Sequence, residues 1–204
     1  MVQRSEFRSY RRNDLVIEPD EWTDRMYCVT GGLLRVVASG DAGSADVTTD
    51  FIRGGDIFHG PLLSEDRYQA ASTLIAALPS SVYLVPVAAV RELCAKHPEM
   101  ALGLVDLTLR RTGLLRRHRR HISSLSAQAL VRRVLHELTQ LAPVGSGGYD
   151  KRITQAAIAS YSGLSREVVN KTMRDMESRG LVRRDGEGIH VPPDLGSDCD
   201  CSNH

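Results

Sequence analysis

The segment ITQAAIASYSGLSREVVNKTMRDMESRGLVRRDGEGIHV, residues 153–191, decides the fold of the C-terminal part of the chain. Thr154 is a good N-cap for a first short helix, and Ser165 is a good N-cap for a second one. Gly163 lies between them, where two helices joined at a steep angle need a residue without a Cβ atom. Residues 185–188, Asp-Gly-Glu-Gly, are typical of a tight hairpin turn. Helix, glycine turn, capped helix and hairpin together predict a winged helix-turn-helix.

The second helix of this segment divides into an apolar face and a polar one. The residues expected to face inward are Val168, Val169, Thr172, Met173 and Met176. The residues expected to be exposed near its N-terminus are Arg166, Glu167, Asn170, Lys171 and Arg174. An arginine can donate two hydrogen bonds to guanine, and a glutamate can accept one from cytosine N4, so this face is suited to reading DNA bases. An alternative is a solvated helix surface with an intrahelical ion pair.

The distribution of charge agrees with a polyanion-binding C-terminal part. The whole chain has a net charge of +1. Counting Lys and Arg against Asp and Glu, residues 1–109 carry −5 and residues 110–190 carry +9. Such asymmetry indicates a module for nucleic acid, although a solvated basic surface would look the same by charge alone.

Short strands are expected over residues 14–87. Runs rich in Val, Ile, Leu, Tyr and Thr recur there at roughly ten-residue spacing and are bounded by Gly, Pro, Asp and Ser, which predicts an antiparallel roll or barrel. The glycine pairs at 31–32 and 54–55 would supply the positive φ angles of tight turns.

The periodicity then changes to that of helices. A short helix is predicted over residues 87–97, a long one over 98–123 and another over 126–141, followed by a turn-rich connector at 143–150. The apolar stripe expected on the long helix is Met100, Leu104, Leu107, Leu114 and Leu115, with arginines, Arg111 among them, over much of the remaining surface. A second copy of the chain is the simplest partner for this stripe, and packing on the chain's own roll is the alternative.

The predicted fold class is therefore α+β. We expect an antiparallel β-roll at 1–97, a dimerisation helix at 98–123, a winged helix-turn-helix at 124–193 and a disordered tail at 194–204. No apolar run approaches the ~20 residues that span a bilayer, and the N-terminus lacks the apolar stretch of a secretion signal. A cytoplasmic location is the default expectation. Cys28 and Cys94 are expected to stand apart as inert thiols in apolar surroundings.

Residues 163–169, GLSREVV, resemble a known signature. They match the Gly-x-Ser-Arg-Glu-Thr-Val pattern in the recognition helix of the cyclic-AMP receptor protein and fumarate-nitrate regulator (Crp/Fnr) family. The resemblance extends more weakly over nearly the whole chain. Residues 15–37 are similar to the first strands of the family's cyclic-nucleotide-binding roll, and residues 54–66 resemble the start of its phosphate-binding cassette.

The resemblance implies a function and a set of site residues. Arg166, Glu167 and Lys171 fall on base-reading positions, and Thr154, Gln155 and Ser165 fall on positions that contact DNA phosphates. Lys171 replaces the family's arginine, which keeps the charge but loses the planar fork. The partners implied are double-stranded DNA with a palindromic site, a second copy of the chain as homodimer, and RNA polymerase as the target of activation.

The effector pocket of the family is degenerate in this sequence. Nucleotide binding needs a Gly-Glu pair and a later Arg-Ser or Arg-Thr pair, whereas here Gly60 precedes Pro61 and Ala71 precedes Ser72. Arg67 is off the required spacing by about four residues. A phosphodiester would enter such a pocket unpaired, so we expect cyclic AMP to bind weakly or not at all.

No cofactor or metal is expected. An iron–sulfur sensor needs a cysteine cluster near the N-terminus, where only Cys28 stands, and His59 is the single histidine that could ligate haem in the roll. Cys199 and Cys201 are assigned to a tail rather than to oxidant sensing.

Two versions of the regulator stay open: one active without ligand, and one gated by an unidentified small molecule. A cupin-like metal enzyme is disfavoured because none of the seven histidines forms a His-x-His pair. A module that only binds protein is disfavoured by Arg166, Glu167 and Lys171 on a basic segment.

Overall fold

The computed structural model describes residues 5–39, 46–59, 64–145 and 147–192. The chain divides into two compact units, Met1–Gly40 with Thr49–Arg117 and Asp41–Thr48 with His118–His204. Gly60, Pro61, Cys199 and Cys201 lie outside the described residues.

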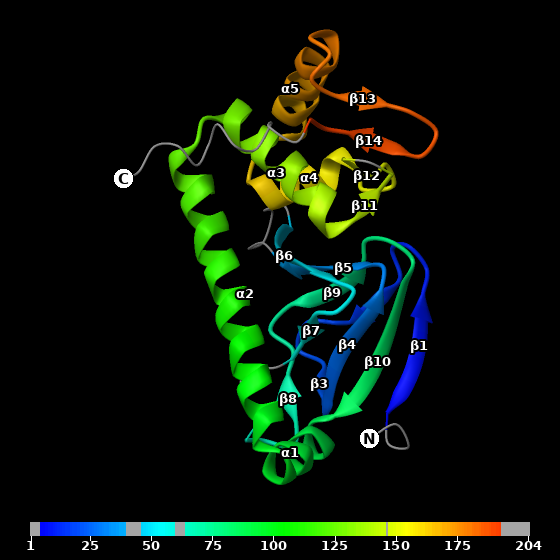
Figure 1. The fold of residues 1–204 in the computed structure, drawn as a ribbon, viewed down its shortest axis with the longest axis vertical. Helices are drawn as coiled ribbons and strands as arrows, with labels where there is room; N and C mark the ends of the chain where they lie inside the picture. The colour runs from blue at the N-terminus through cyan, green and yellow to red at the C-terminus, as the bar shows by residue number, and fades with distance from the viewer. Residues whose placement is uncertain (1–4, 40–45, 60–63, 146, 193–204) are drawn as a thin grey trace. The chain divides into compact units, whose positions relative to one another are not determined.

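The first unit is built from antiparallel strands, which confirms the predicted roll (Figure 1). One sheet has the order β1 (Glu6–Tyr10), β10 (Ser80–Pro86), β4 (Arg25–Gly31) and β7 (Ile57–Phe58). A second has the order β2 (Leu15–Ile17), β9 (Thr73–Ala76), β5 (Leu33–Ala38) and β6 (Val47–Arg53). A short pair joins β3 (Trp22–Thr23) to β8 (Tyr68–Gln69). Strand β1 was not predicted, because its side chains are mostly exposed and show no apolar face.

The strands of this unit sort their side chains by the two-residue period of a β-strand. In β4, Tyr27 and Val29 belong to the main core, together with Leu34, Leu74 and Val82. Their neighbours Met26 and Cys28 point to the other face of the strand.

That other face packs on a smaller cluster formed by Met26, Val85 and Val90. Both Cys28 and Cys94 contact this cluster and both are free thiols, which confirms that they lie in apolar surroundings. Burial raises the pKa of the Cys28 thiol, which keeps it protonated.

Two helices follow the roll, α1 (Val87–Lys96) and α2 (Pro98–Ser124), close to the predicted limits. The apolar stripe predicted on α2 needs correction. Leu104 packs against the Met26 cluster, whereas Leu102, Val105 and Leu109 are 68%, 53% and 64% exposed. The outward stripe on this part of α2 is therefore shifted from the predicted one, because the roll takes the face that carries Leu104.

In its described residues, the second unit contains the C-terminal end of α2, three further helices and a four-stranded sheet. The helices are α3 (Ala127–Leu141), α4 (Gln155–Ser162) and α5 (Arg166–Ser178). The sheet has the order β11 (Pro143–Val144), β12 (Gly148–Asp150), β14 (Gly188–His190) and β13 (Arg183–Arg184). The predicted hairpin is confirmed as β13 and β14 (Figure 1).

The segment predicted as a connector, residues 143–150, instead forms β11 and β12. Tyr149 explains the difference, because its side chain is fully buried and β12 pairs with β14. A stretch rich in glycine and proline gave no local sign of this long-range pairing.

Substituting Gly32 with alanine should destabilise the first unit. Gly32 has a φ of 81°, and a Cβ atom there would lie 2.2 Å from the Pro79 carbonyl oxygen. The positive φ alone costs about 1–3 kcal/mol, and the clash adds to it. Urea unfolding followed by the fluorescence of Trp22, the single tryptophan, measures the loss. Gly31→Ala is the matched control, since nothing lies within 4 Å of its Cβ position. Equal stability of the two variants would contradict this account of the turn.

Candidate nucleic-acid interface

Helix α4 begins and ends as its sequence predicts. Thr154 adopts an extended conformation, and its hydroxyl oxygen accepts a hydrogen bond from the Ala157 amide at 3.1 Å. At the other end, Gly163 has φ 67° and ψ 19°, in the left-handed region. This glycine turns the chain sharply between α4 and α5, as a helix-turn-helix requires.

Helix α5 is capped in the same way by Ser165. Its hydroxyl oxygen accepts a hydrogen bond from the Val168 amide at 3.2 Å. Val169, Met173 and Met176 are each 0% exposed and hold the helix in the core. Val168 was predicted to face inward, but it is 36% exposed. The buried positions follow the spacing i, i+4 and i+7, and Val168 lies outside that narrow arc.

The opposite face of α5 presents charged side chains to solvent. Arg166, Glu167 and Lys171 are all exposed, as is Arg174, while Asn170 is half-buried. Within the described residues, the side chains of Arg166, Glu167 and Lys171 make no hydrogen bond or ion pair. The alternative of an intrahelical ion pair on this face therefore does not hold for these three side chains.

The residues expected to contact phosphates lie at the two helix N-termini. Thr154 and Ser165 are exposed, and Gln155 is half-buried. Each hydroxyl oxygen accepts a bond from its own helix, which leaves the hydroxyl proton able to donate to another group. The N-terminal ends of both helices also favour anions because of their unpaired amides and dipoles.

A polar cluster that the sequence analysis missed holds α4 in place. Tyr161 of α4 donates a hydrogen bond from its hydroxyl to Glu137 Oε1 of α3 at 2.9 Å. The His118 ring stacks on the Tyr161 ring with centroids 3.8 Å apart, and its Nε2 lies 3.0 Å from the Tyr161 carbonyl oxygen. The sequence feature that could have indicated this cluster is Tyr161, a large side chain among the small residues of α4.

The wing, which is the hairpin of β13 and β14, is held in place by its turn and by contact with α5. Asp185 Oδ1 accepts hydrogen bonds from the Glu187 and Gly188 amides, both at 2.9 Å. These bonds hold the pKa of the Asp185 carboxyl below its usual range, and the bond from the Gly188 amide has the larger effect. Arg184 of β13 pairs with Glu177 of α5, which ties the hairpin to the recognition helix.

Of the residues expected in the effector pocket, two are described by the structure and two are not. Ala71 is exposed and Ser72 half-buried, at the bend before β9. The Arg67 guanidinium lies over the Trp22 ring, 5.8 Å from its centroid. Gly60 and Pro61 belong to the part of the chain that the structure does not describe.

Arg111 of α2 occupies a polar site on the roll that the sequence analysis missed. It was expected on the helix surface, but its side chain is only 21% exposed. It donates to Asp50 Oδ2 at 2.5 Å, to Asp56 Oδ2 at 3.3 Å and to the Phe51 carbonyl oxygen at 2.7 Å. Arg111 and Asp50 also line a pocket of about 250 Å³ with His59 and Leu115.

No group of three or more His, Cys, Asp or Glu side chains in the described segments is placed to hold a metal ion.

Two family models match this chain. Residues 131–193 match a Crp-like helix-turn-helix domain, and residues 7–97 match a cyclic nucleotide-binding domain. The chain belongs to the Crp/Fnr family of transcription regulators. This finding confirms the resemblance of its recognition-helix signature. The family consists of DNA-binding regulators and not enzymes, so the enzyme alternative is excluded.

Relatives and solved structures agree with this membership. This Crp/Fnr regulator is 27% identical over 188 residues to a CRP-like cAMP-activated global transcriptional regulator of Mycobacterium tuberculosis, covering 89% of this chain and 82% of the relative. Its fold matches FixK2 from Bradyrhizobium japonicum with a TM-score of 0.85 at 18% identity, covering 98% and 99% of the two chains. It matches the regulator CLP of Xanthomonas campestris with a TM-score of 0.74 at 17% identity, covering 93% and 95%. None of the helices in the described segments is long and apolar enough to cross a membrane.

Two substitutions of Gly163 in this regulator should show whether a side chain there lowers stability through backbone strain or through crowding. The nearest atom to a Cβ there is Ile122 Cγ2 at 3.9 Å, an ordinary contact, so the cost comes from the positive φ. We expect Gly163→Ala to lose about 1 kcal/mol. Gly163→Asn should lose less, because asparagine enters the left-handed region more readily. Thermal unfolding followed by far-UV circular dichroism makes the comparison, and an equal loss in both variants would argue for crowding instead.

Proposed function

We propose that this regulator binds a palindromic promoter site as a homodimer, without cyclic AMP, and activates transcription through RNA polymerase. The observation that carries the proposal is the exposed face of Arg166, Glu167 and Lys171, which have no partner among the described residues, on a helix whose opposite face is fully buried. Contact with RNA polymerase rests on family membership.

The chemistry of α5 supports base reading. Arg166 is suited to donating two hydrogen bonds to guanine O6 and N7, and Glu167 to accepting a hydrogen bond from the amino group at cytosine N4. Lys171 supplies one further positive charge, but its ammonium group lacks the planar, two-pronged donor geometry of an arginine. Thr154, Gln155 and Ser165 at the helix N-termini would position the protein on the phosphates, where contacts fix register and carry no sequence information.

The outward stripe of α2 supports a dimer. Leu102, Val105 and Leu109 follow the spacing i, i+3 and i+7 and are each more than half exposed. This spacing forms the seam of a two-stranded coiled coil. Two-fold pairing through it would present one recognition helix to each half-site of a palindrome, about 34–36 Å apart.

The environment of Arg111 supports independence from cyclic AMP. Its guanidinium is already satisfied by two carboxylates and a carbonyl oxygen, which fasten α2 to the roll with no ligand. Asp56 also lies 3.9 Å from Arg53, so the two carboxylates and the two guanidinium groups at this site are already paired with one another. The relatives from Mycobacterium tuberculosis and Pasteurella multocida are named as cAMP-activated. The Glu and Arg that the family resemblance implies for nucleotide binding are replaced in this chain by Pro61 and Ala71.

Selection of bound sequences from a random duplex library tests the DNA-binding proposal. The purified protein, with no added ligand and at moderate salt, should enrich a palindromic motif with two equivalent half-sites. Failure to enrich any motif without ligand, followed by success after cell extract is added, would show that the regulator is gated.

The Arg166→Ala variant tests whether α5 is the helix that reads the bases of the selected motif. It should lose about 1–3 kcal/mol of binding free energy and relax the preference at one base pair in each half-site. Arg179→Ala is the matched control, because Arg179 lies at the other end of α5 and pairs with Asp175 at 3.4 Å. Unchanged binding by Arg166→Ala would mean that another surface reads the bases.

Calorimetric titration with cyclic AMP tests the effector proposal. We expect no saturable heat under conditions in which the cAMP-activated Mycobacterium tuberculosis relative, used as the positive control, becomes saturated. Binding of cyclic AMP to this chain in the micromolar range would overturn the claim.

A further inference from the structure

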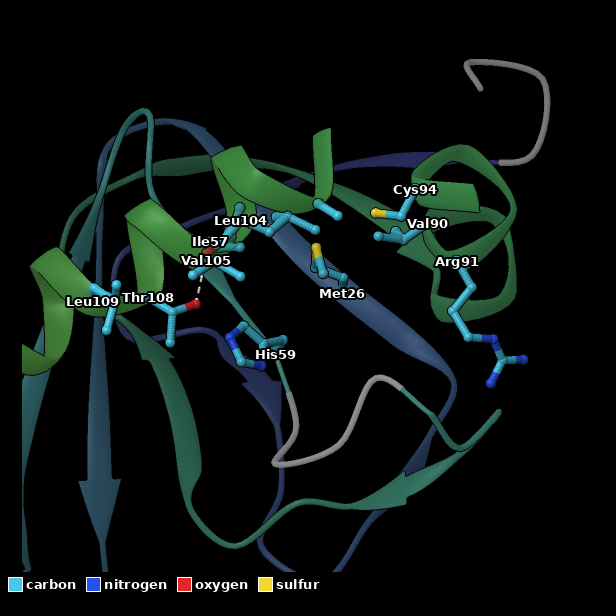
Figure 2. Close-up of a pocket in the computed structure, with 11 residues that line it drawn as sticks. Met26, Ile57, His59, Val90, Arg91, Cys94, Leu104, Val105, Thr108 and Leu109 are labelled. Carbon is cyan, nitrogen blue, oxygen red and sulfur yellow. Dashed lines mark hydrogen bonds between the residues drawn. The ribbon is translucent and has the colours of Figure 1, made fainter. Parts of the chain in front are cut away.

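We propose that the first unit contains a binding site for a neutral, apolar small molecule that carries an aromatic ring. The site is a pocket of about 350 Å³, at the lower end of the size range of ligand pockets. Strands β4 and β7 with the residue after β7, and helices α1 and α2, supply its walls (Figure 2). The side chains that carry the argument are Met26, Val90, Cys94, Leu104, Val105 and Leu109.

The polar side chains that line this pocket are Arg91, Thr108 and His59, and each of them already has an interaction partner. Thr108 donates its hydroxyl proton to the Leu104 carbonyl oxygen of its own helix at 2.8 Å, as the dashed line in Figure 2 shows. Arg91 extends away from the pocket and binds the Ser64 carbonyl oxygen and the Asp66 carboxylate. A charged ligand would therefore lose its hydration with little compensation, whereas a neutral apolar ligand avoids this desolvation penalty.

Two sulfur atoms select for an aromatic ring. Met26 comes from β4 and Cys94 from α1, and Figure 2 shows both sulfur atoms directed toward the pocket interior. Sulfur makes favourable contacts with aromatic rings at about 5 Å, often at the ring edge. Aliphatic side chains from α1 and α2 would supply contacts to the faces of the ring.

This site is separate from the effector positions that the family resemblance assigns. Neither Ala71 nor Ser72 lines the pocket, and Arg111 does not line it either. The floor of the pocket is the Met26 and Val90 side of the small core cluster, not the main core of the roll. The proposal therefore does not depend on nucleotide binding or on the reading of DNA.

The pocket borders the surface that we assign to dimerisation. Val105 and Leu109 line the pocket and also belong to the outward stripe of α2. A ligand in contact with these two side chains would alter the surface that a second copy would bind, so ligand binding could change dimer formation. The competing occupant is the second copy itself, and the experiment separates the two.

Fluorescence titration of the full-length protein with N-phenyl-1-naphthylamine, a neutral aromatic probe, tests the site. We expect saturable binding of one probe per chain with a blue-shifted emission. Cys94→Phe fills the pocket from α1 and should weaken probe binding by more than roughly tenfold. Ala95→Phe is the matched control, because the neighbouring position on the same helix is exposed and does not line the pocket. It should bind the probe as the native chain does.

Each further outcome decides the proposal. If Cys94→Phe loses its native circular dichroism spectrum, Ala101→Leu fills the same pocket from α2 and should also weaken binding. Native-like probe binding by a folded, pocket-filling variant would overturn the site, as would the absence of saturable binding to the native chain. Loss of probe binding as protein concentration drives dimer formation would show that the second copy covers the pocket. Binding of the selected DNA motif, measured on the same variants, reports separately on the proposed function.

Discussion

The orientation of α5 against its own domain is the constraint on which the rest of the interface depends. Val169, Met173 and Met176 are fully buried, so the helix cannot rotate without exposing all three. Gly163 sets the angle at which α5 leaves α4, and the stacked pair of His118 and Tyr161 anchors α4. The charged face of α5 is thereby presented as a rigid surface, which is what base reading needs, since a hydrogen-bond pattern can be matched only from a fixed position.

An ion pair within the first unit joins helix α2 to the roll. Binding of a cyclic nucleotide requires a cation whose hydrogen-bond donors are available to the phosphate. Arg111 instead donates three hydrogen bonds to Asp50, Asp56 and the Phe51 carbonyl oxygen. Partly buried, multiply bonded charges of this kind are costly to break singly, because removal of one partner strands the others. The link between α2 and the roll is thus built into the chain.

Helix α2 has two different apolar faces in the first unit. Leu104 packs toward the Met26 cluster, and Leu102, Val105 and Leu109 remain exposed. The second set is the surface proposed for a partner helix, and its edge forms one wall of the apolar pocket. A molecule in that pocket would contact Val105 and Leu109, the side chains that a second copy would also contact, so the two proposals predict coupling between ligand binding and assembly.

The sequence by itself determined the winged helix-turn-helix, because its signals are local: caps at Thr154 and Ser165, a left-handed glycine at 163 and a hairpin turn at 185–188. It also determined the roll, through the spacing of its strands and turns. Only the tertiary structure decided that Arg111 is paired, that residues 143–150 form strands, that Val168 is exposed and that two cysteines share a cluster. The ion pair, the strands and the shared cluster each depend on a partner far away in the sequence, and the exposure of Val168 depends on how narrow a face of α5 the core covers. A backbone cap binds within three or four residues, whereas an ion pair, a sheet register or a pocket wall exists only after distant segments have packed.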